Sequence, residues 1–483
     1  MECVKRNAKT EYGQRYQFNK INSIKQFQEA VPVVSYPEIS NYIEKIEEGK
    51  TDILFAGRAL AFEQTSGSTY AQKLIPYSKE SLNDFRRAIL PWLSDLINMH
   101  QIQSGSAYWS ISPATRQPEV TKGGVSIGLP DAAYLGEDLI PFFVATSAVP
   151  PWVGCLTDVH DWQLATLYHL VCNRELALIS VWSPTFLLSL LDGLGERQRE
   201  LVNGLQNGLT VNGEVLSPAP VALKPLNDFY DSNALSNLWP DLKVISCWAD
   251  ASSQPFYQQL SERFPGVHIQ AKGLLLTEGV VTAPNHENQT VLTADSGFYE
   301  FLDASGNIIL PDELVEGESY EVLITTANGL YRYRTFDKVV CDGVSSDLPV
   351  LQFIGRSDLF SDLVGEKLTE DFVASCLQSI TGFRMLIPCR GDKPGYLLVL
   401  DKNSRHDVKT VLNKVSASLL KNPQYAHACK VGQLSGLKSL VLVDPLKIFL
   451  NGLEKTGVRL GDIKVPALCV KTDIFDVQIG TAA

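Results

Sequence analysis

The hydrophobic positions along this chain change their spacing several times, which predicts helices and strands in alternation. Apolar residues recur at helical spacing over 36–50, which ends in a glycine-containing turn, so an exposed helix is expected there. A second amphipathic run covers Lys79–His100, with Ser78 as a capping residue, and Pro91 should kink or restart that helix. The apolar run Ile53–Phe62 precedes it, which gives a strand–loop–helix order.

The middle of the chain moves from helical to strand-like patterning. Residues 162–206 read as helical, with Pro184 starting a second helix. Short runs closed by turn residues then predict six strands: Lys243–Trp248, Gly273–Leu276, Val280–Thr282, Phe298–Leu302, Ser319–Thr326 and Val350–Ile354. The alternation indicates an α/β fold with an antiparallel portion around 290–355.

A new α/β pattern begins after a hinge at about 356–360. Helices are expected at Glu370–Ile380 and His406–Leu420, with a strand at Gly395–Leu400 between them. We therefore expect a large domain over 1–356 and a small C-terminal domain over 357–483.

Composition narrows the class of protein. With 483 residues, 45% of them hydrophobic and 20% charged, the chain fits a soluble globular protein of two or more domains. Its nine cysteines form no CxxC pair and no cluster with histidine, which argues against zinc and disulfides and favours a reducing, cytoplasmic location. The longest apolar stretch, Leu139–Leu156, is broken by three prolines, so we expect buried core or a pocket wall rather than a membrane span.

The net charge of −12 counts against nucleic acid as a partner. The charge is uneven, because residues 357–483 hold 16 basic and 13 acidic side chains, a balance of +3. Residues 1–356 hold 26 and 41, a balance of −15. This suits a lid that brings lysines to phosphates, and it equally suits chance variation.

The segment from Thr65 to Lys73 carries the most informative chemistry. Its hydroxyls and backbone N–H groups can donate to phosphate oxygens, its glycine permits a tight turn, and its lysine adds a positive charge. A solvated turn of the same composition is the alternative. The candidate phosphate-binding residues are Thr65, Ser66, Gly67, Ser68, Thr69 and Lys73.

This spacing resembles the first core motif of the adenylate-forming superfamily. Tyr70 stands for the second glycine and Gln72 for the proline of that motif, and with Ala71 and Pro76 the segment looks like the plant auxin-responsive acyl-acid amido synthetases. The chain is identified as a member of that family, of a bacterial type. The resemblance implies a large adenylate-forming domain with mixed sheets and a β-barrel-like portion, followed by a small mobile C-terminal domain.

Two further motifs carry carboxylates. The stretch Leu275–Gly279 resembles the family's Thr-Glu motif, which makes Glu278 the implied Mg²⁺ ligand and Thr277 a phosphate donor. A plain turn after a buried strand is the alternative. The stretch Tyr331–Asp337 is the strongest match and implies that Asp337 accepts the ribose hydroxyls, although Phe336 stands where the family has glycine. The alternative there is a strand with its arginines facing solvent.

Basic residues follow in the family's order. Arg356, in a Gly-Arg-Ser-Asp hinge motif, is implied to contact ribose or phosphate, with Asp358 as the pivot. Lys367 lies nine residues beyond that aspartate and would neutralise phosphate charge. Lys464, near the C-terminal end, is the lysine implied to reach the acyl carboxylate, and a surface lysine is the alternative.

The acyl pocket is less clearly marked. Trp248 and Ala249 lie at a predicted strand end that in the family borders the nucleotide and acyl pockets. Where plant members place an arginine on the helix after the phosphate loop, this chain has Leu93, and Leu90 replaces a nearby tyrosine. Arg86 or Arg87 could bind the acid instead, and solvated arginines are the alternative. Leu90, Trp92 and Leu93 suggest an apolar acyl group.

The resemblance implies an ATP-dependent, Mg²⁺-dependent ligase that adenylates a carboxylic acid and then transfers the acyl group to an amino acid or other amine. ATP and Mg²⁺ are the expected cofactors, and the oligomeric state stays open. Two alternatives remain at this point: an acyl-CoA ligase, and a non-catalytic nucleotide-binding relative.

Overall fold

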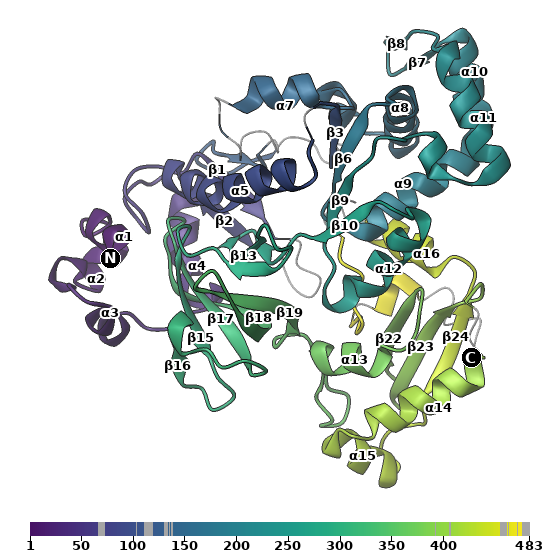
Figure 1. Cartoon of the computed structure of the whole chain (residues 1–483). Coiled ribbons are helices and arrows are strands. Elements are labelled where there is room, and N and C mark those ends of the chain that lie inside the picture. Colours follow the sequence, from purple (N-terminus) through teal and green to yellow (C-terminus); the bar gives the residue numbers. More distant parts are fainter. Residues whose placement is uncertain are drawn as a thin grey trace. The chain divides into compact units, whose positions relative to one another are not determined.

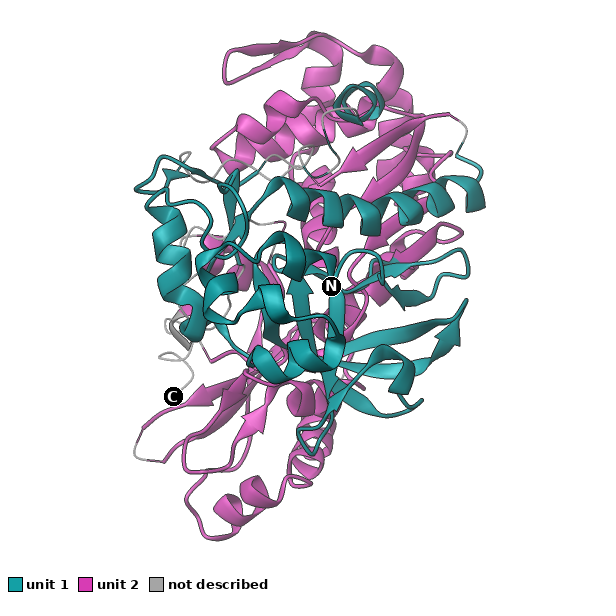
Figure 2. Cartoon of the chain, turned by 90° about the vertical axis from the view of Figure 1, so that its left-hand side faces the viewer, with its two compact units in different colours: residues 1–103, 116–146, 271–353 teal, residues 104–115, 147–270, 354–483 magenta. Residues whose placement is uncertain are grey.

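The computed structural model divides into two compact units, which Figure 2 colours separately. Unit 1 comprises Met1–Gln103, Arg116–Thr146 and Ala271–Phe353. Unit 2 comprises Ser104–Thr115, Ser147–Gln270 and Ile354–Ala483. The structure describes residues 1–65, 73–102, 104–110, 119–129, 134, 136, 139–391, 393–404, 407–454, 461, 463–470 and 472–475. The expected domains, 1–356 and 357–483, remain a prediction.

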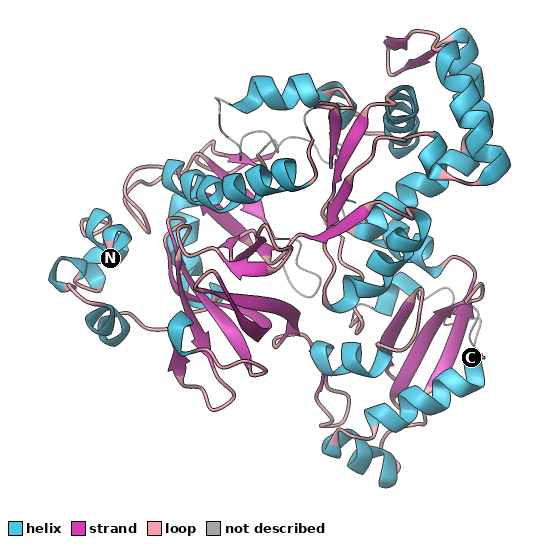
Figure 3. Ribbon diagram, in the orientation of Figure 1, coloured by secondary structure: helices cyan, strands magenta, loops and turns pink. Residues whose placement is uncertain are grey.

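Unit 1 is built on two main sheets (Figures 1 and 3). Four strands run in the order β2-β1-β5-β4, and seven in the order β13-β14-β19-β18-β17-β15-β16. The seven-stranded sheet is open among the described strands, so the expected barrel-like portion is not a closed barrel. The strands are β1 Ala61–Gln64, β2 Leu74–Tyr77, β4 Glu119–Val120, β5 Ser126–Ile127, β11 Leu275–Leu276, β12 Gly279–Val280, β13 Thr282–Pro284, β14 Thr290–Leu292, β15 Phe298–Leu302, β16 Ile308–Ile309, β17 Ser319–Thr326, β18 Leu330–Ser345 and β19 Leu348–Arg356.

The helices of unit 1 are short at the N-terminus and long after β2. They are α1 Glu2–Arg6, α2 Glu11–Arg15, α3 Ile24–Ala30, α4 Tyr36–Glu47, α5 Lys79–Met99 and α7 Ile140–Thr146. The N-terminal helices join the core of the large sheet through aromatic rings, for example Tyr12 stacked on Tyr331 of β18 with centroids 5.1 Å apart. Helix α4 was expected to be exposed, but its apolar face is buried in the same core, so that expectation is wrong for one face.

Helix α5 follows β2, as the strand–loop–helix pattern predicted. Ser78 and Ser81 form a capping box at its start, which confirms the predicted cap. The helix continues through the exposed Pro91, so the predicted restart at this residue is wrong.

Unit 2 contains a four-stranded sheet in the order β10-β9-β6-β3 and a three-stranded sheet in the order β22-β23-β24. Its strands are β3 Ser106–Trp109, β6 Leu176–Ser180, β7 Leu209–Val211, β8 Glu214–Leu216, β9 Val244–Cys247, β10 His268–Ala271, β20 Phe360–Ser361, β21 Leu368–Thr369, β22 Arg384–Cys389, β23 Gly395–Asp401 and β24 Lys438–Leu442. Its helices are α8 Val159–Cys172, α9 Pro184–Glu196, α10 Gln198–Asn207, α11 Leu223–Ser232, α12 Gln254–Arg263, α13 Glu370–Leu377, α14 Val408–Leu419, α15 Pro423–Lys430 and α16 Pro445–Glu454.

Two hydrophobic clusters stabilise unit 2. The larger one joins helices α8 to α12 with one face of the C-terminal sheet, through Met385 and Val399. The smaller one covers the opposite face, where Leu386 and Leu398 pack against α13 and α14. The C-terminal sheet is therefore buried on both faces by apolar contacts.

Two expectations about apolar segments fail. Strand β6 lies inside 162–206, which was predicted as wholly helical, and all five of its residues are buried. The expectation of buried core for Leu139–Leu156 is wrong only for its first half, which forms α7 with Phe142 and Val144 exposed. In the second half Val149, Val153 and Leu156 are buried in the core, as expected. Within the described residues, none of the helices is both long and apolar enough to cross a membrane.

Candidate functional site

The ends of the candidate phosphate-binding loop, Thr65 and Lys73, are held together beside the β1–β2 pair. The Thr65 N–H donates to the Lys73 carbonyl over 2.9 Å, and the Lys73 N–H donates to Thr65 Oγ1 over 3.3 Å. The Lys73 Nζ lies 5.7 Å from the ring centroid of Tyr36, whose hydroxyl pKa is raised by burial. The remaining candidates in this loop, Ser66, Gly67, Ser68 and Thr69, lie outside the described residues.

Thr277 and Glu278 form the connection between β11 and β12, and their main chain is fixed by three side chains. The Tyr77 hydroxyl donates to the Thr277 carbonyl over 2.6 Å. Asn328 Nδ2 and Thr326 Oγ1 both donate to the Glu278 carbonyl, over 3.1 and 3.3 Å. Burial, together with the carboxylates of Glu63 and Glu278, raises the pKa of the Tyr77 hydroxyl well above its usual range, so this hydroxyl stays a donor at neutral pH.

A cavity of about 10 Å³ adjoins this hairpin. It is lined by Tyr77, Ser81, Asp84, Phe85, Glu278, Gly279, Val280, Ser296, Thr326 and Asn328. Its size matches a single small molecule such as water, so the space beside the hairpin is nearly filled by protein.

Asp337 lies at a bulge in β18. Between the pairs Leu323↔Arg334 and Glu321↔Lys338, β18 advances four residues while β17 advances two. The Asp337 side chain is 1% exposed, and its N–H donates to Thr335 Oγ1 over 3.1 Å.

Phe336 takes a left-handed conformation, with φ of 66°. The backbone therefore has the geometry that the family's glycine favours, although a phenylalanine stands there. The Arg334 guanidinium lies 4.8 Å from the centroid of this ring. The stacking holds the ring while the bulge presents the next residue, Asp337.

The two arginines of this motif have structural partners. Arg332 is 5% exposed and makes a bidentate pair with Glu300, with distances of 2.9 and 3.0 Å. The alternative of a solvent-facing strand is therefore wrong for Arg332. Arg334, which is more exposed, pairs with Glu321.

The hinge segment and Lys367 belong to unit 2. Arg356 binds both carboxylate oxygens of Asp358 over 2.9 Å each. Lys367 is exposed and left-handed, with φ of 44°. Its neighbour Glu366 is fully buried and accepts from the N–H groups of Leu363 and Val364 over 2.8 Å. Glu366 thus orders the loop that displays the lysine.

The structure brings Lys464 and Trp248 together, although they are far apart in sequence. The Lys464 Nζ lies 4.6 Å from the Trp248 ring centroid. Trp248 follows β9, its N–H donates to the Trp182 carbonyl over 2.9 Å, and Ala249 comes next in the chain. Close by in sequence, the Ala467 N–H donates to Glu370, a buried carboxylate whose pKa is raised, mainly by desolvation. Lys464 is therefore held by a cation–π contact rather than being a freely solvated lysine.

The candidate acid-binding residues lie on α5. The Arg86 guanidinium packs against Gly136, where a Cβ atom would come within 2.9 Å of three of its atoms, and its Nε donates no hydrogen bond within the described part of the chain. Leu90 is 39% exposed, and Leu93 is half-buried. Arg86 is thus half-buried, and its Nε is enclosed by protein without a hydrogen-bond partner in the described chain.

Sequence reasoning missed the residues that hold the candidates in place. Tyr77, Thr326 and Asn328 contact a hairpin that is far from them in sequence, and no spacing rule marks them. The available signal was weak: Thr326 and Asn328 lie five and three residues before the Tyr331–Asp337 motif, and Tyr77 directly precedes the cap of α5.

Comparison with known families settles the family. Residues 1–269 match the GH3 family N-terminal domain, and residues 290–356 match the GH3 family central domain. The chain belongs to the GH3 family. Among curated relatives, this GH3 protein is 24% identical to a jasmonoyl–L-amino acid synthetase, JAR4, of Nicotiana attenuata, over 99% of this chain and 91% of that protein.

Solved structures share the fold of this GH3 protein. The acyl acid amido synthetase AtGH3.15, in complex with 2,4-DB, superposes with a TM-score of 0.87 at 17% identity, covering 99% of this chain and 92% of that one. A 2-hydroxyisobutyryl-CoA ligase in the postadenylation state gives 0.60 at 11% identity, covering 99% and 89%. Relatives such as JAR4 come from plants, so the expectation of a bacterial type gains no support.

Proposed function

We propose that this GH3 protein is an AMP-forming acyl-acid amido synthetase. It adenylates a carboxylic acid with ATP, releases pyrophosphate, and transfers the acyl group to an amino acid or other amine with release of AMP. The observation that carries the proposal is the Glu278 carboxylate on a hairpin whose main chain is fixed by three buried donors. Family membership and the fold of AtGH3.15 support the same reaction class.

The residues of unit 1 fit a nucleotide. Asp337 is a buried carboxylate at a bulge and can accept both ribose hydroxyls. Thr65 and Lys73, at the two ends of the loop, offer a hydroxyl and an ammonium group to phosphate oxygens. Glu278 would supply an oxygen ligand of the kind that Mg²⁺ prefers, and the ion would supply positive charge that neutralises the phosphates.

Two displacement steps follow from the proposed roles. In the first, a carboxylate oxygen of the acid attacks the α-phosphorus of ATP, and the bond to pyrophosphate breaks. In the second, a neutral amine attacks the acyl carbon, the bond to AMP breaks, and the amine loses a proton. Positioning and charge neutralisation by Lys464, Lys367 and Arg356 provide the catalysis, because neither step needs covalent chemistry by the protein.

The acid is proposed to be held by Arg86 and an apolar surface. The guanidinium is half-buried on α5, and its positive charge suits a carboxylate. Leu90 and Leu93, on the same helix as Arg86, are the proposed apolar contacts of unit 1, and the proposed roles of Trp248 and Ala249 in unit 2 rest on the sequence resemblance alone. The nine free thiols suit a reducing compartment, so we propose the cytoplasm as the location.

The test is mass spectrometry of the purified protein with Mg²⁺·ATP, a pool of carboxylic acids, and either amino acids or CoA. The proposal expects AMP together with an N-acyl amino acid. An acyl-CoA product would instead identify a ligase of the kind that shares the fold at a TM-score of 0.60. A protein that binds ATP but forms AMP with none of the pooled acids would indicate a non-catalytic relative.

A further inference from the structure

The Thr277–Glu278 hairpin cannot fix its own geometry. Its strands β11 and β12 are two residues long each, paired only as Leu275↔Val280 and Leu276↔Gly279. A two-stranded ribbon of this length is marginal in isolation. The position of Glu278 must therefore be set by contacts from other elements.

Those contacts come mainly from the turn between β17 and β18. Asn328 and Thr326 are buried, and both donate to the Glu278 carbonyl. A Cβ at Gly279 would lie 3.0 Å from Thr326 Cγ2, so the turn packs closely on the hairpin. On the other side, Tyr77 donates to the Thr277 carbonyl. The two consecutive carbonyls are thus held by donors from different elements.

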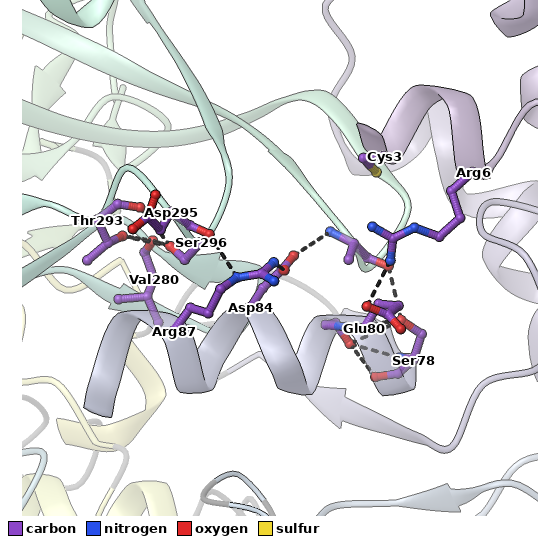
Figure 4. Close-up of polar contacts among 12 residues, drawn as sticks. Cys3, Arg6, Ser78, Glu80, Asp84, Arg87, Val280, Thr293, Asp295 and Ser296 are labelled. Carbon is purple, nitrogen blue, oxygen red and sulfur yellow. Dashed lines mark hydrogen bonds and ion pairs between the residues drawn. The ribbon is translucent and has the colours of Figure 1, made fainter. Parts of the chain in front are cut away.

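The turn is itself anchored to the start of α5, whose residues Ser78, Asp84 and Arg87 are labelled in Figure 4. The Ala327 N–H donates to Asp84 Oδ2 over 3.2 Å, and Ser78 Oγ donates to the Ala327 carbonyl over 3.1 Å. Asp84 also pairs with Arg87, whose Nε donates to the Asp295 carbonyl over 2.9 Å. Every polar group of Ala327 is therefore used, which leaves Asn328 and Thr326 little freedom to move.

We propose that the turn 326–328 positions the Glu278 carboxylate, with Asn328 as the principal positioning residue and Thr326 and Tyr77 as supporting ones. This inference rests on the proposed role of Glu278 as a metal ligand. Groups that orient a metal ligand typically alter metal affinity by about 10- to 100-fold when they are removed. A buried donor to the main chain of the ligand acts by the same route, because it sets where the carboxylate can reach.

The test compares ATP affinity with Mn²⁺ and in EDTA, measured by calorimetry, with electron paramagnetic resonance of bound Mn²⁺ as a second readout. The ratio of the two affinities is the metal advantage. Asn328→Leu removes the donor at similar volume, and we expect it to lower the metal advantage about 10-fold while ATP affinity in EDTA stays unchanged. Thr326→Val and Tyr77→Phe should give smaller losses of the same kind.

Two matched variants separate positioning from stability. Thr326→Ser keeps the hydroxyl and should retain the wild-type metal advantage. Tyr230→Phe removes a tyrosine hydroxyl that donates to the Leu194 carbonyl in unit 2, and should also leave the metal advantage unchanged. If Glu278→Gln abolishes the metal advantage and Asn328→Leu does not, the positioning role is wrong and the metal role stands. If Glu278→Gln has no effect either, the metal role in the proposed function fails, and the positioning role fails with it.

Discussion

Each unit contains a buried arginine, and the two differ in how many partners the guanidinium has among the described residues. In unit 1, Arg332 forms a bidentate pair with Glu300, which is 1% exposed. The Nη1 of Arg332 also donates to the carbonyls of Gln28 and Val31 over 2.7 and 2.8 Å. In unit 2, Arg384 at the start of β22 is 9% exposed, and its Nη1 is buried without a hydrogen-bond partner in the described chain. Desolvation lowers the pKa of Arg384 to about 10.

This difference indicates that the buried polar network makes the region around Arg332 in unit 1 rigid. A satisfied buried network ties the N-terminal segment to β18, five residues before Asp337, so unit 1 presents its carboxylates on a fixed frame. Unit 2 carries its candidate lysines differently: Lys367 is exposed in a loop, and Lys464 lies over an indole ring. The pairing of Arg332 defines local geometry, whereas burial of Arg384, whose Nη1 has no partner among the described residues, is expected to cost stability.

The largest effect is expected from the substitution that removes the Glu278 carboxylate in unit 1. Glu278→Gln should lower the rate of acyl-adenylate formation on the order of 1000-fold, since charge neutralisation at the phosphates is lost. Acid-dependent pyrophosphate exchange measures this. Glu318→Gln, an exposed site in the same unit, is the control and should keep the wild-type rate.

The second largest effect is expected from removing one partner of the buried Arg332–Glu300 pair. Arg332→Met leaves Glu300 buried without its partner, and we expect a loss of about 3–5 kcal/mol in the free energy of unfolding, measured by urea denaturation. Arg332→Met combined with Glu300→Leu should recover much of that loss. A single variant as stable as the wild type would contradict the account of the buried pair.

On the unit 2 side, Lys464→Met keeps the length of the side chain and removes its charge. The rate of adenylation should fall about 10- to 100-fold, while the unfolding midpoint stays nearly unchanged because the residue is only half-buried. Rapid-quench measurement of acyl-AMP reads this step directly. Equal rates in variant and wild type would remove Lys464 from the mechanism.

A change of the opposite sign in the free energy of unfolding is expected for Arg384, whose Nη1 has no hydrogen-bond partner in the described chain. Arg384→Met removes a desolvated charge at similar volume, so the free energy of unfolding should rise by about 1–3 kcal/mol. Thermal and urea unfolding of this variant and of Arg332→Met measure the two changes in the free energy of unfolding, which should have opposite signs. A destabilised Arg384→Met would mean that the guanidinium makes favourable interactions in the native state.

The smallest effect concerns pH. Burial raises the pKa of Glu370 above its usual 4.5, so the folded state holds this proton more tightly than the unfolded state does. Stability should therefore fall as pH rises through the interval just above 4.5. Glu370→Gln, which keeps an acceptor for the Ala467 N–H, should flatten that part of the stability–pH curve. An unchanged slope would show that other groups cause it.

The sequence predicted those parts whose signal is local. Strands β15 and β17 have the predicted bounds, because alternation and turn residues mark both. Strand β6 was missed because a continuous apolar run has no period that separates a strand buried on both faces from a helix. Phe336 departs from the family's glycine, yet the bulge imposes a left-handed backbone there.

Candidate residues that belong to sequence motifs could be predicted from the sequence. Contacts that form only in the tertiary structure could not. Motif resemblance alone singled out Glu278, which lies in the connection between β11 and β12, and Asp337, which lies in β18. The contact of Lys464 with Trp248 and the hold of Asn328 on Glu278 depend on chain segments that only folding brings together. These two contacts therefore depend on the tertiary structure, and the spacing of residues in the sequence does not predict them.

The measurement that tests the central claim most directly is acid-dependent exchange of labelled pyrophosphate into ATP, followed by addition of amino acids. The account predicts exchange that requires a carboxylic acid and Mg²⁺, is lost in Glu278→Gln, and gives way to AMP and an N-acyl amino acid once the amine is present. Exchange that persists in Glu278→Gln, or an acyl group that passes only to CoA, would contradict it.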